Sequence, residues 1–130
     1  MNILSQEIRS CMAFPAEKKE GGAIARFSFP EGFTGFKGHF PSGGIVPGVC
    51  KVQALVMLAE FLNDKNFELE EIKEAKFFLP VSPNEELIFD YSENIISERE
   101  AIIKASVSCE GRKVAKMELS GFFTSVEEEQ

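Results

Sequence analysis

The loop from Gly38 to Gly48 contains His39, the single histidine in this chain of 130 residues. The loop is rich in glycine and proline, and it opens directly into the most hydrophobic helix candidate of the sequence, which extends to Asn63. A long, glycine-rich connection of this kind is typical of a functional segment. We therefore expect the chemistry of the protein at this loop, and we interpret His39 as a catalytic residue in preference to a structural one.

The segment from Pro47 to Asp64 is expected to form the helix that follows this loop. Pro47 suits the first turn because its missing N–H would lack a helical partner there in any case. At the usual rise the helix would be about 27 Å long, and the segment is too short and too polar for a membrane span. Gln53 lies on a mostly apolar stripe, whereas Lys51 points nearly the other way. A buried amide needs partners, so Gln53 is either a site residue or a core amide. The rest of the stripe is Val49, Val56, Met57 and Glu60.

Three segments of the sequence resemble a single protein family. The first runs from His39 to Ala54 and reads His-Phe-Pro, then Pro-Gly-Val, then Gln53 followed by alanine. The second is the basic, aromatic and proline-containing segment from Lys76 to Pro83. The third is the run from Lys104 to Leu119, with its Gly111 turn. Together they resemble the beta-hydroxyacyl-(acyl-carrier-protein) dehydratases of fatty-acid synthesis, which have the hotdog fold.

This resemblance implies a mechanism and a role for several residues. In the family, the motif histidine, here His39, removes the proton next to the thioester carbonyl. A carboxylate on the central helix, contributed across a dimer interface, protonates the departing 3-hydroxyl, and its position is occupied here by Gln53. Glutamine can hydrogen-bond a hydroxyl or a water molecule but has no proton to give near neutral pH. The backbone N–H of Gly48, at the start of the helix, would polarise the thioester carbonyl.

The missing carboxylate leaves three ways to protonate the leaving group. His39 could act alone with a water molecule held by Gln53, or Glu60 could reach back, although it lies about 10 Å further along the helix axis. A sister subunit could instead supply the carboxylate in a mixed dimer, which is chemically the simplest arrangement. A positioned acid or base contributes about 10²–10⁴-fold in rate, so its loss would cripple dehydration without removing binding.

The resemblance implies a dehydratase-like protein that acts on 3-hydroxyacyl thioesters in fatty-acid or polyketide-like synthesis. Two alternatives remain open, namely a non-catalytic acyl-thioester binding or partner subunit of a mixed hotdog dimer, and an acyl thioesterase. We expect an acyl carrier protein or coenzyme A thioester as partner, and a homodimer or mixed hotdog dimer, with assembly beyond the dimer left open. The expected substrate-binding residues are Phe40, Gly48, Val49 and Met57, and Phe40 and Met57 serve equally well as core residues.

Composition indicates one globular domain, residues 1–130. The sequence is 44% hydrophobic with 13 phenylalanines, enough to form a substantial core. The formal charge of −7 argues against nucleic acid as a partner, since phosphate binding needs a concentrated basic surface. Docking an acidic carrier protein would require a local basic patch. Candidates for such a patch are Lys37, Lys51, Lys76, Arg112, Lys113 and Lys116.

The first residues of the sequence show no basic region followed by an apolar stretch, so no secretory signal is expected. The three cysteines, Cys11, Cys50 and Cys109, show no pairing pattern and are interpreted as free thiols. Free thiols and the lack of an expected secretory signal together favour a cytoplasmic location. Cys50 is interpreted as a packing residue of the central helix. No pair of residues has metal-ligand spacing, and we expect neither a metal nor another cofactor.

Alternation of apolar and polar residues predicts a series of strands. A first short strand is expected at Ile8 to Phe14 and a charged turn at Glu17 to Gly22. Period-2 strands in succession with short turns indicate an antiparallel meander, and one buried helix beside it gives an α+β domain in which the sheet wraps the helix. The later strands are expected at Ala23 to Phe29, Ile72 to Leu79, Glu86 to Tyr91, Ala101 to Cys109 and Lys113 to Phe123, with a Glu110-Gly111 turn between the last two.

Overall fold

The computed structural model describes residues 8–12, 16–30 and 48–125. The predictions made for His39, Phe40, Lys37 and Pro47 lie outside these residues. The described part contains one long helix and six strands. These are β1 (Glu17–Lys19), β2 (Gly22–Ser28), α2 (Gly48–Asn63), β3 (Asn66–Phe77), β4 (Glu86–Ile95), β5 (Glu100–Cys109) and β6 (Arg112–Thr124).

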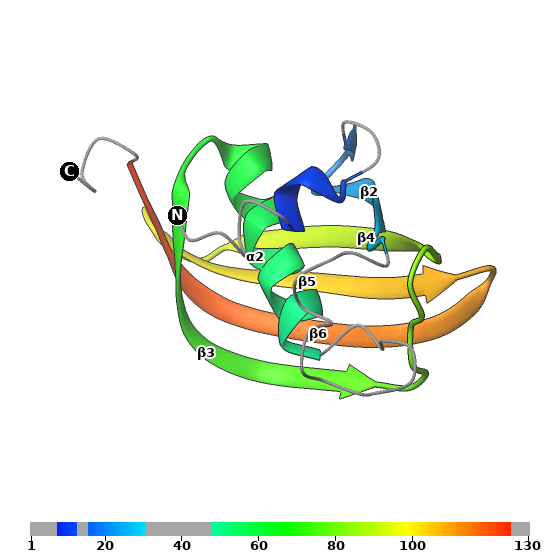
Figure 1. Ribbon diagram of the computed structural model, residues 1–130. Helices are drawn as coiled ribbons and strands as arrows, with labels where there is room; N and C mark the ends of the chain where they lie inside the picture. The colour runs from blue at the N-terminus through cyan, green and yellow to red at the C-terminus, as the bar shows by residue number, and fades with distance from the viewer. Residues whose placement is uncertain (1–7, 13–15, 31–47, 126–130) are drawn as a thin grey trace.

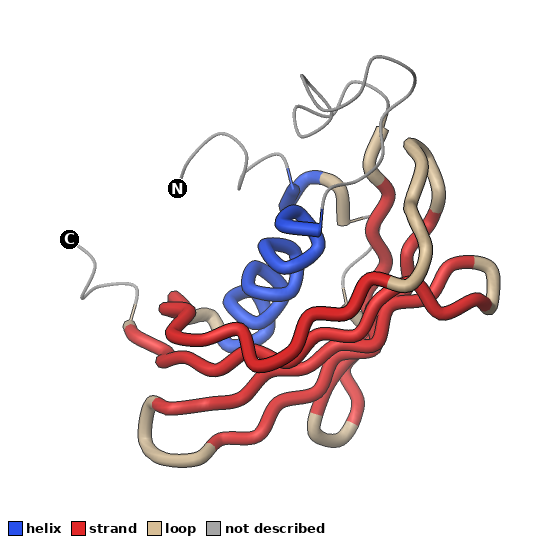
Figure 2. Tube along the Cα trace, turned by 90° about the horizontal axis from the view of Figure 1, so that it is seen from below, coloured by secondary structure: helices blue, strands red, loops and turns tan. Residues whose placement is uncertain are grey.

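The strands form one antiparallel sheet in the order β1-β2-β4-β5-β6-β3. Helix α2 lies across one face of this sheet (Figure 1), and the view from below shows the sheet curving around it (Figure 2). The predicted meander is correct for β4, β5 and β6 but wrong for β3, which pairs with β6 at the far edge. The reason is that the segment containing α2 carries the chain from β2 near one edge across the sheet to the other.

The apolar residues of the alternating strands face the helix, as predicted. On β2 the side chains of Ala23, Ala25 and Phe27 are buried, and β4 presents Leu87, Phe89 and Tyr91 in the same way. The rings of Phe27 and Phe89, on neighbouring strands, lie 4.9 Å apart between centroids. Burial of each such large side chain contributes roughly 1.5–3 kcal/mol to folding, so this face of the sheet and α2 form the core. The strands β5 and β6 add Ala101, Ile103, Ala105, Val107, Cys109, Ala115, Met117 and Leu119.

Two turns of the chain contain residues with positive φ, and the first is the predicted Glu110-Gly111 turn. Glu110 and Gly111 have φ of 50° and 78°, and they connect β5 to β6 as a two-residue hairpin turn. After α2, Asp64 has φ of 51° and the Lys65 N–H donates to the Glu60 carbonyl at 3.3 Å. This left-handed residue ends the helix and turns the chain directly into β3.

Strand β3 lies unusually close to β6 at Gly121. A Cβ atom at this position would lie 2.2 Å from the Glu68 carbonyl oxygen and 2.6 Å from the Phe67 ring. Only glycine fits such an approach, and the fit brings the first half of β3 against the body of the sheet. Edge strand β3 therefore has a fixed position relative to α2, which matters for the groove described below.

The beginning of the chain differs from its prediction. Residues 8–10 are helical instead of extended, and Met12 makes an isolated bridge with Phe27. Strand β1 occupies part of the expected turn and pairs with β2. Strand β3 begins at Asn66, six residues before the predicted start at Ile72. Its first half is acidic and mostly exposed on both faces, so alternation could not reveal it; backbone pairing with β6 decides it.

The three cysteines, Cys11, Cys50 and Cys109, are free and buried, as predicted, and Cys50 packs within α2. Within the described ranges, no helix has the length and hydrophobicity needed to cross a bilayer.

Candidate functional site

The first turn of α2 is shaped by contact between Gly48 and Phe77. A Cβ atom at Gly48 would lie 2.7 Å from Cε2 of Phe77, so the ring occupies the space that any other residue would need. Phe77 ends β3 and thereby ties this edge strand to the start of the helix. The N–H groups of the first helical turn lack partners within the helix and carry its positive dipole end. This end of α2 is therefore suited to an oxygen that carries partial negative charge.

Gln53 lies one and a half turns further along, on the wall of a groove between α2 and the first half of β3. The groove has a volume of about 340 Å³, and its walls are almost equally polar and apolar. Gln53 is half-buried, which agrees with its predicted place on a mostly apolar stripe. The groove is lined by Val52, Gln53, Val56, Met57, Glu60, Asn66, Phe67 and Leu69.

Glu60 lines the same groove but has a structural contact. Its Oε2 atom accepts a hydrogen bond of 2.9 Å from the backbone N–H of Phe67, near the start of β3. The carboxylate thus joins the end of α2 to the edge strand. Glu60 is therefore engaged with the backbone of β3.

Two of the predicted substrate-binding residues have different environments. Met57 is 6% exposed and contributes to the groove wall one turn beyond Gln53. Val49, one turn before Gln53, is 69% exposed. Val49 is therefore an exposed apolar residue near the start of the helix, and β3 also exposes apolar side chains at Leu69, Ile72 and Phe77.

Lys51 corrects one sequence prediction. It was a candidate for a basic docking patch, yet it is only 2% exposed, and its Nζ atom lies 5.1 Å from the centre of the Phe77 ring. Burial lowers the pKa of this ammonium, and the neighbouring Cys50 offsets the shift in part. The error arises because helical spacing gives the direction of a side chain but not which strand covers it. A lysine within an otherwise apolar helix was the available signal.

The other basic candidates differ in their surroundings. Lys76 and Lys116 both form ion pairs with Glu74, at 3.6 and 3.7 Å, on the exposed edge of the sheet. The Nζ atom of Lys113 lies 5.6 Å from the centre of the Phe78 ring, at the end of the molecule where α2 begins. Exposed ion pairs contribute little free energy, so these contacts orient the lysines more than they stabilise the fold.

A partly buried polar cluster at the opposite end of α2 was not predicted. The Tyr91 hydroxyl donates to Oε1 of Glu93 at 2.7 Å, and Nδ2 of Asn63 donates to the same oxygen at 2.9 Å. Asn63 Nδ2 also lies 2.9 Å from the Ala59 carbonyl, within the last turn of the helix. Burial, followed by the Glu93 contact, raises the pKa of Tyr91 well above its usual value. This cluster fixes the helix end to β4, and it does not line the groove beside Gln53.

The structure therefore brings Gln53, Met57 and Glu60 together on one groove and places Gly48 at the start of the same helix. Among residues 8–12, 16–30 and 48–125, no three histidine, cysteine, aspartate or glutamate side chains lie so as to hold a metal ion.

Comparison with known proteins agrees with this architecture. Residues 15–118 match the family model of the ApeI-like dehydratases, described as ApeI dehydratase. The chain belongs to this family. Family membership confirms the resemblance drawn from the His39 and Lys76 segments.

Curated relatives of this ApeI-like chain are 3-hydroxyacyl-[acyl-carrier-protein] dehydratases named FabZ. The protein from Nitrosospira multiformis is 35% identical over 96 residues, which cover 65% of this chain and 64% of the relative. The protein from a Wolbachia species of Drosophila simulans is 38% identical over 73 residues, covering 51% and 50%. The chain thus spans between half and just under two thirds of the length of these relatives.

Solved structures show the same fold at low sequence identity. A dehydratase heterocomplex named ApeI:P from Xenorhabdus doucetiae has a TM-score of 0.71 at 15% identity, covering 85% of this chain and 96% of that one. A hypothetical thioesterase from Streptococcus pneumoniae, solved with coenzyme A, has a TM-score of 0.70 at 10% identity, covering 94% of each chain. The predicted hotdog fold, an antiparallel sheet around one central helix, is confirmed for this ApeI-like protein.

Proposed function

We propose that this protein is a dehydratase for 3-hydroxyacyl thioesters carried by an acyl carrier protein or coenzyme A. The observation that carries the proposal is the groove of about 340 Å³ beside Gln53, the residue that by resemblance takes the place of the family's helix carboxylate. Membership of the ApeI-like dehydratases and the FabZ relatives supports the reaction class.

The reaction removes water from carbons 2 and 3 of the acyl group. His39 takes the proton from carbon 2, and the developing negative charge on the thioester oxygen is stabilised by the N–H of Gly48 at the start of α2. The bond from carbon 3 to its hydroxyl then breaks, the double bond forms, and the hydroxyl leaves as water once it receives a proton. Gln53 holds that hydroxyl, or a water molecule next to it, by hydrogen bonds.

Gln53 cannot supply the proton for the leaving hydroxyl, so another group must donate it. In a homodimer, the imidazolium formed at His39 returns it. In a mixed dimer, a carboxylate on the partner's central helix supplies it, which is the more effective route because a positioned acid contributes about 10²–10⁴-fold. Exposed apolar side chains on α2 and β3, among them Val49 and Ile72, which are at least half exposed, offer contacts for such a partner. The heterocomplex found for a dehydratase of the same fold supports this arrangement.

A second candidate is a non-catalytic subunit that binds an acyl thioester or stabilises an active relative. The specific observation in its favour is the amide at Gln53, which cannot donate a proton in the way a carboxylic acid does. In that case the groove still binds the acyl group but does not turn it over.

The test is a turnover assay with a 3-hydroxyacyl thioester, in which enoyl formation and thiol release are followed separately. It compares the wild type with Gln53→Glu and His39→Ala, each checked for an intact fold by circular dichroism. Asn66→Asp is the matched control, because Asn66 lines the same groove and undergoes the same change from amide to carboxylate.

If the wild type forms enoyl product and His39→Ala does not, the result supports a dehydratase that works without the usual carboxylate. A silent wild type with an active Gln53→Glu, and an inactive Asn66→Asp, supports the partner-subunit role. Thiol release without enoyl product would instead identify a thioesterase. The proposal is wrong if neither wild type nor Gln53→Glu forms enoyl product, alone or mixed with a hotdog protein that carries the helix carboxylate.

A further inference from the structure

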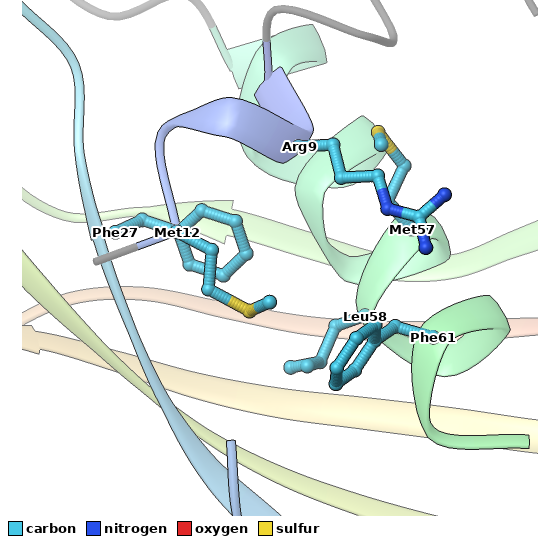
Figure 3. A pocket seen from close by; sticks show the side chains of 6 residues that line it. All are labelled: Arg9, Met12, Phe27, Met57, Leu58 and Phe61. Atoms are coloured by element: carbon cyan, nitrogen blue, oxygen red, sulfur yellow. The ribbon is translucent and has the colours of Figure 1, made fainter. Parts of the chain in front are cut away.

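Met57 belongs to two cavities at once. On one side it lines the groove that contains Gln53, between α2 and β3. On the other side it lines a small pocket under the N-terminal turn, between α2 and β2. Figure 3 shows this pocket, with Met57, Leu58 and Phe61 from α2, Phe27 from β2, and Arg9 and Met12 from the N-terminal turn. Met57 therefore borders both the candidate site and a second space.

The two cavities lie beside one row of side chains on α2. Gln53, Met57 and Phe61 are each four residues apart, so their side chains lie above one another on neighbouring turns. From Gln53 to Phe61 this row extends about 12 Å along the axis. A linear group that starts beside Gln53 and follows the helix would therefore pass Met57 and arrive at Phe61.

The second pocket is suited to hydrocarbon. Its walls are almost wholly apolar, and its volume is about 10 Å³, the space of one small group. Phe27 is buried at the inner side, while Phe61 is 41% exposed at the outer side. The Arg9 guanidinium lies 5.9 Å from the centre of the Phe61 ring and covers this outer wall. An apolar space this small does not bind water, so it can accept a methyl or methylene group.

Methionine suits a movable partition. Its side chain has three rotatable bonds and no branch, so it can move between two packings at low cost, which a branched residue cannot. At Met57 a rotation away from the pocket would join the pocket to the groove. A leucine or valine at this point would give a fixed wall.

We infer that Met57 is a gate between the groove at Gln53 and the pocket at Phe61, and that this pocket holds the far end of the acyl chain. The inference rests on the proposed function, since it places the thioester end of the same substrate beside Gln53. It makes Met57 and Phe61 the residues that set acyl-chain length. Short acyl groups stay within the groove, and longer ones displace Met57 and contact Phe61.

The test measures binding apart from turnover. S-alkyl-pantetheine thioethers, which cannot be dehydrated or hydrolysed, are titrated from butyl to decyl against the wild type, Met57→Ala and Phe61→Ala. Met57→Ala removes the partition, so the longest chains should bind about tenfold more tightly relative to butyl, the gain expected from burial of one or two further methylene groups. Phe61→Ala removes contacts at the far end and should weaken only the longest chains, several-fold.

Leu62→Ala is the matched control. Leu62 is a half-buried residue of the same helix, and it borders a different cavity, next to Asn63 and Tyr91. It should lower stability while leaving the ratio of long-chain to short-chain affinity unchanged. If Met57→Ala proves too unstable, Phe61→Ala carries the test, because its side chain is partly exposed.

The possible failures are distinguishable. If the wild type binds no thioether of any length, the groove itself is not an acyl site and the proposed function loses its support. If the wild type binds acyl groups but Met57→Ala and Phe61→Ala change short and long chains equally, the groove stands and the gate is wrong.

Discussion

The Nζ atom of Lys51 lies 5.1 Å from the centre of the Phe77 ring, in a position that is 2% exposed. A buried ammonium has lost most of its hydration, and attraction to an aromatic ring restores only about 1–2 kcal/mol of that loss. The lowered pKa of Lys51 has the same cause. The helix that carries the candidate site thus contains a charge at an energetically unfavourable place.

Lys51→Met should raise the free energy of unfolding by about 1 kcal/mol at neutral pH, because methionine keeps the apolar stem and removes the charge. The pH dependence follows from the sign of the shift. Between the lowered pKa and the ordinary value of 10.5, the unfolded state binds more protons at Lys51 than the folded state, so stability rises with pH there. Urea denaturation of wild type and variant from neutral pH to the ordinary pKa checks this. The same slope in both proteins would contradict it.

Gly48→Ala should destabilise the protein by about 1–2 kcal/mol. The new methyl group meets the Phe77 ring at 2.7 Å, and overpacking outweighs the gain in helix propensity. In a Phe77→Ala background the same substitution should be neutral or stabilising, since the ring is gone. A double-mutant cycle on thermal unfolding measures the coupling. If the effects of Gly48→Ala and Phe77→Ala on stability are additive, contact with the Phe77 ring does not explain the glycine at position 48.

Glu60→Ala should cost about 1–2 kcal/mol, because the Phe67 N–H loses its acceptor at the start of β3. Glu60→Gln keeps an oxygen for that N–H and should retain most of the stability. Hydrogen exchange at the Phe67 amide is the direct measurement. Both variants lack the carboxylate, so an equal and large loss of turnover in the two would instead identify Glu60 as the proton donor.

Tyr91→Phe should lower stability by about 1 kcal/mol, since Glu93 loses a partly buried hydrogen bond of 2.7 Å. Because the pKa of Tyr91 is raised in the folded state, the unfolded state releases its proton first above pH 10.0, and stability falls there. The variant should lack this part of the alkaline decline. Calorimetry at neutral and alkaline pH tests it, and an unchanged alkaline decline would assign that decline to other groups.

Local sequence pattern determined much of the fold. Alternation gave the buried face of β2, β4, β5 and β6, and glycine at 111 gave the hairpin between β5 and β6. The apolar run gave α2 to within a residue at each end, and the motifs around positions 39 to 54 gave the family. These features depend on residues that are neighbours in the chain, which is why the sequence alone was sufficient.

Tertiary structure decided the rest. Pairing of β3 with β6, and the acidic first half of β3, depend on contacts between distant strands, so no local pattern revealed them. The burial of Lys51 depends on Phe77, a residue 26 positions later in the printed sequence. The pocket beside Met57 is built from the N-terminal turn, β2 and α2. A sequence specifies which faces are apolar, but only the packing of distant segments determines which faces meet and what space they leave.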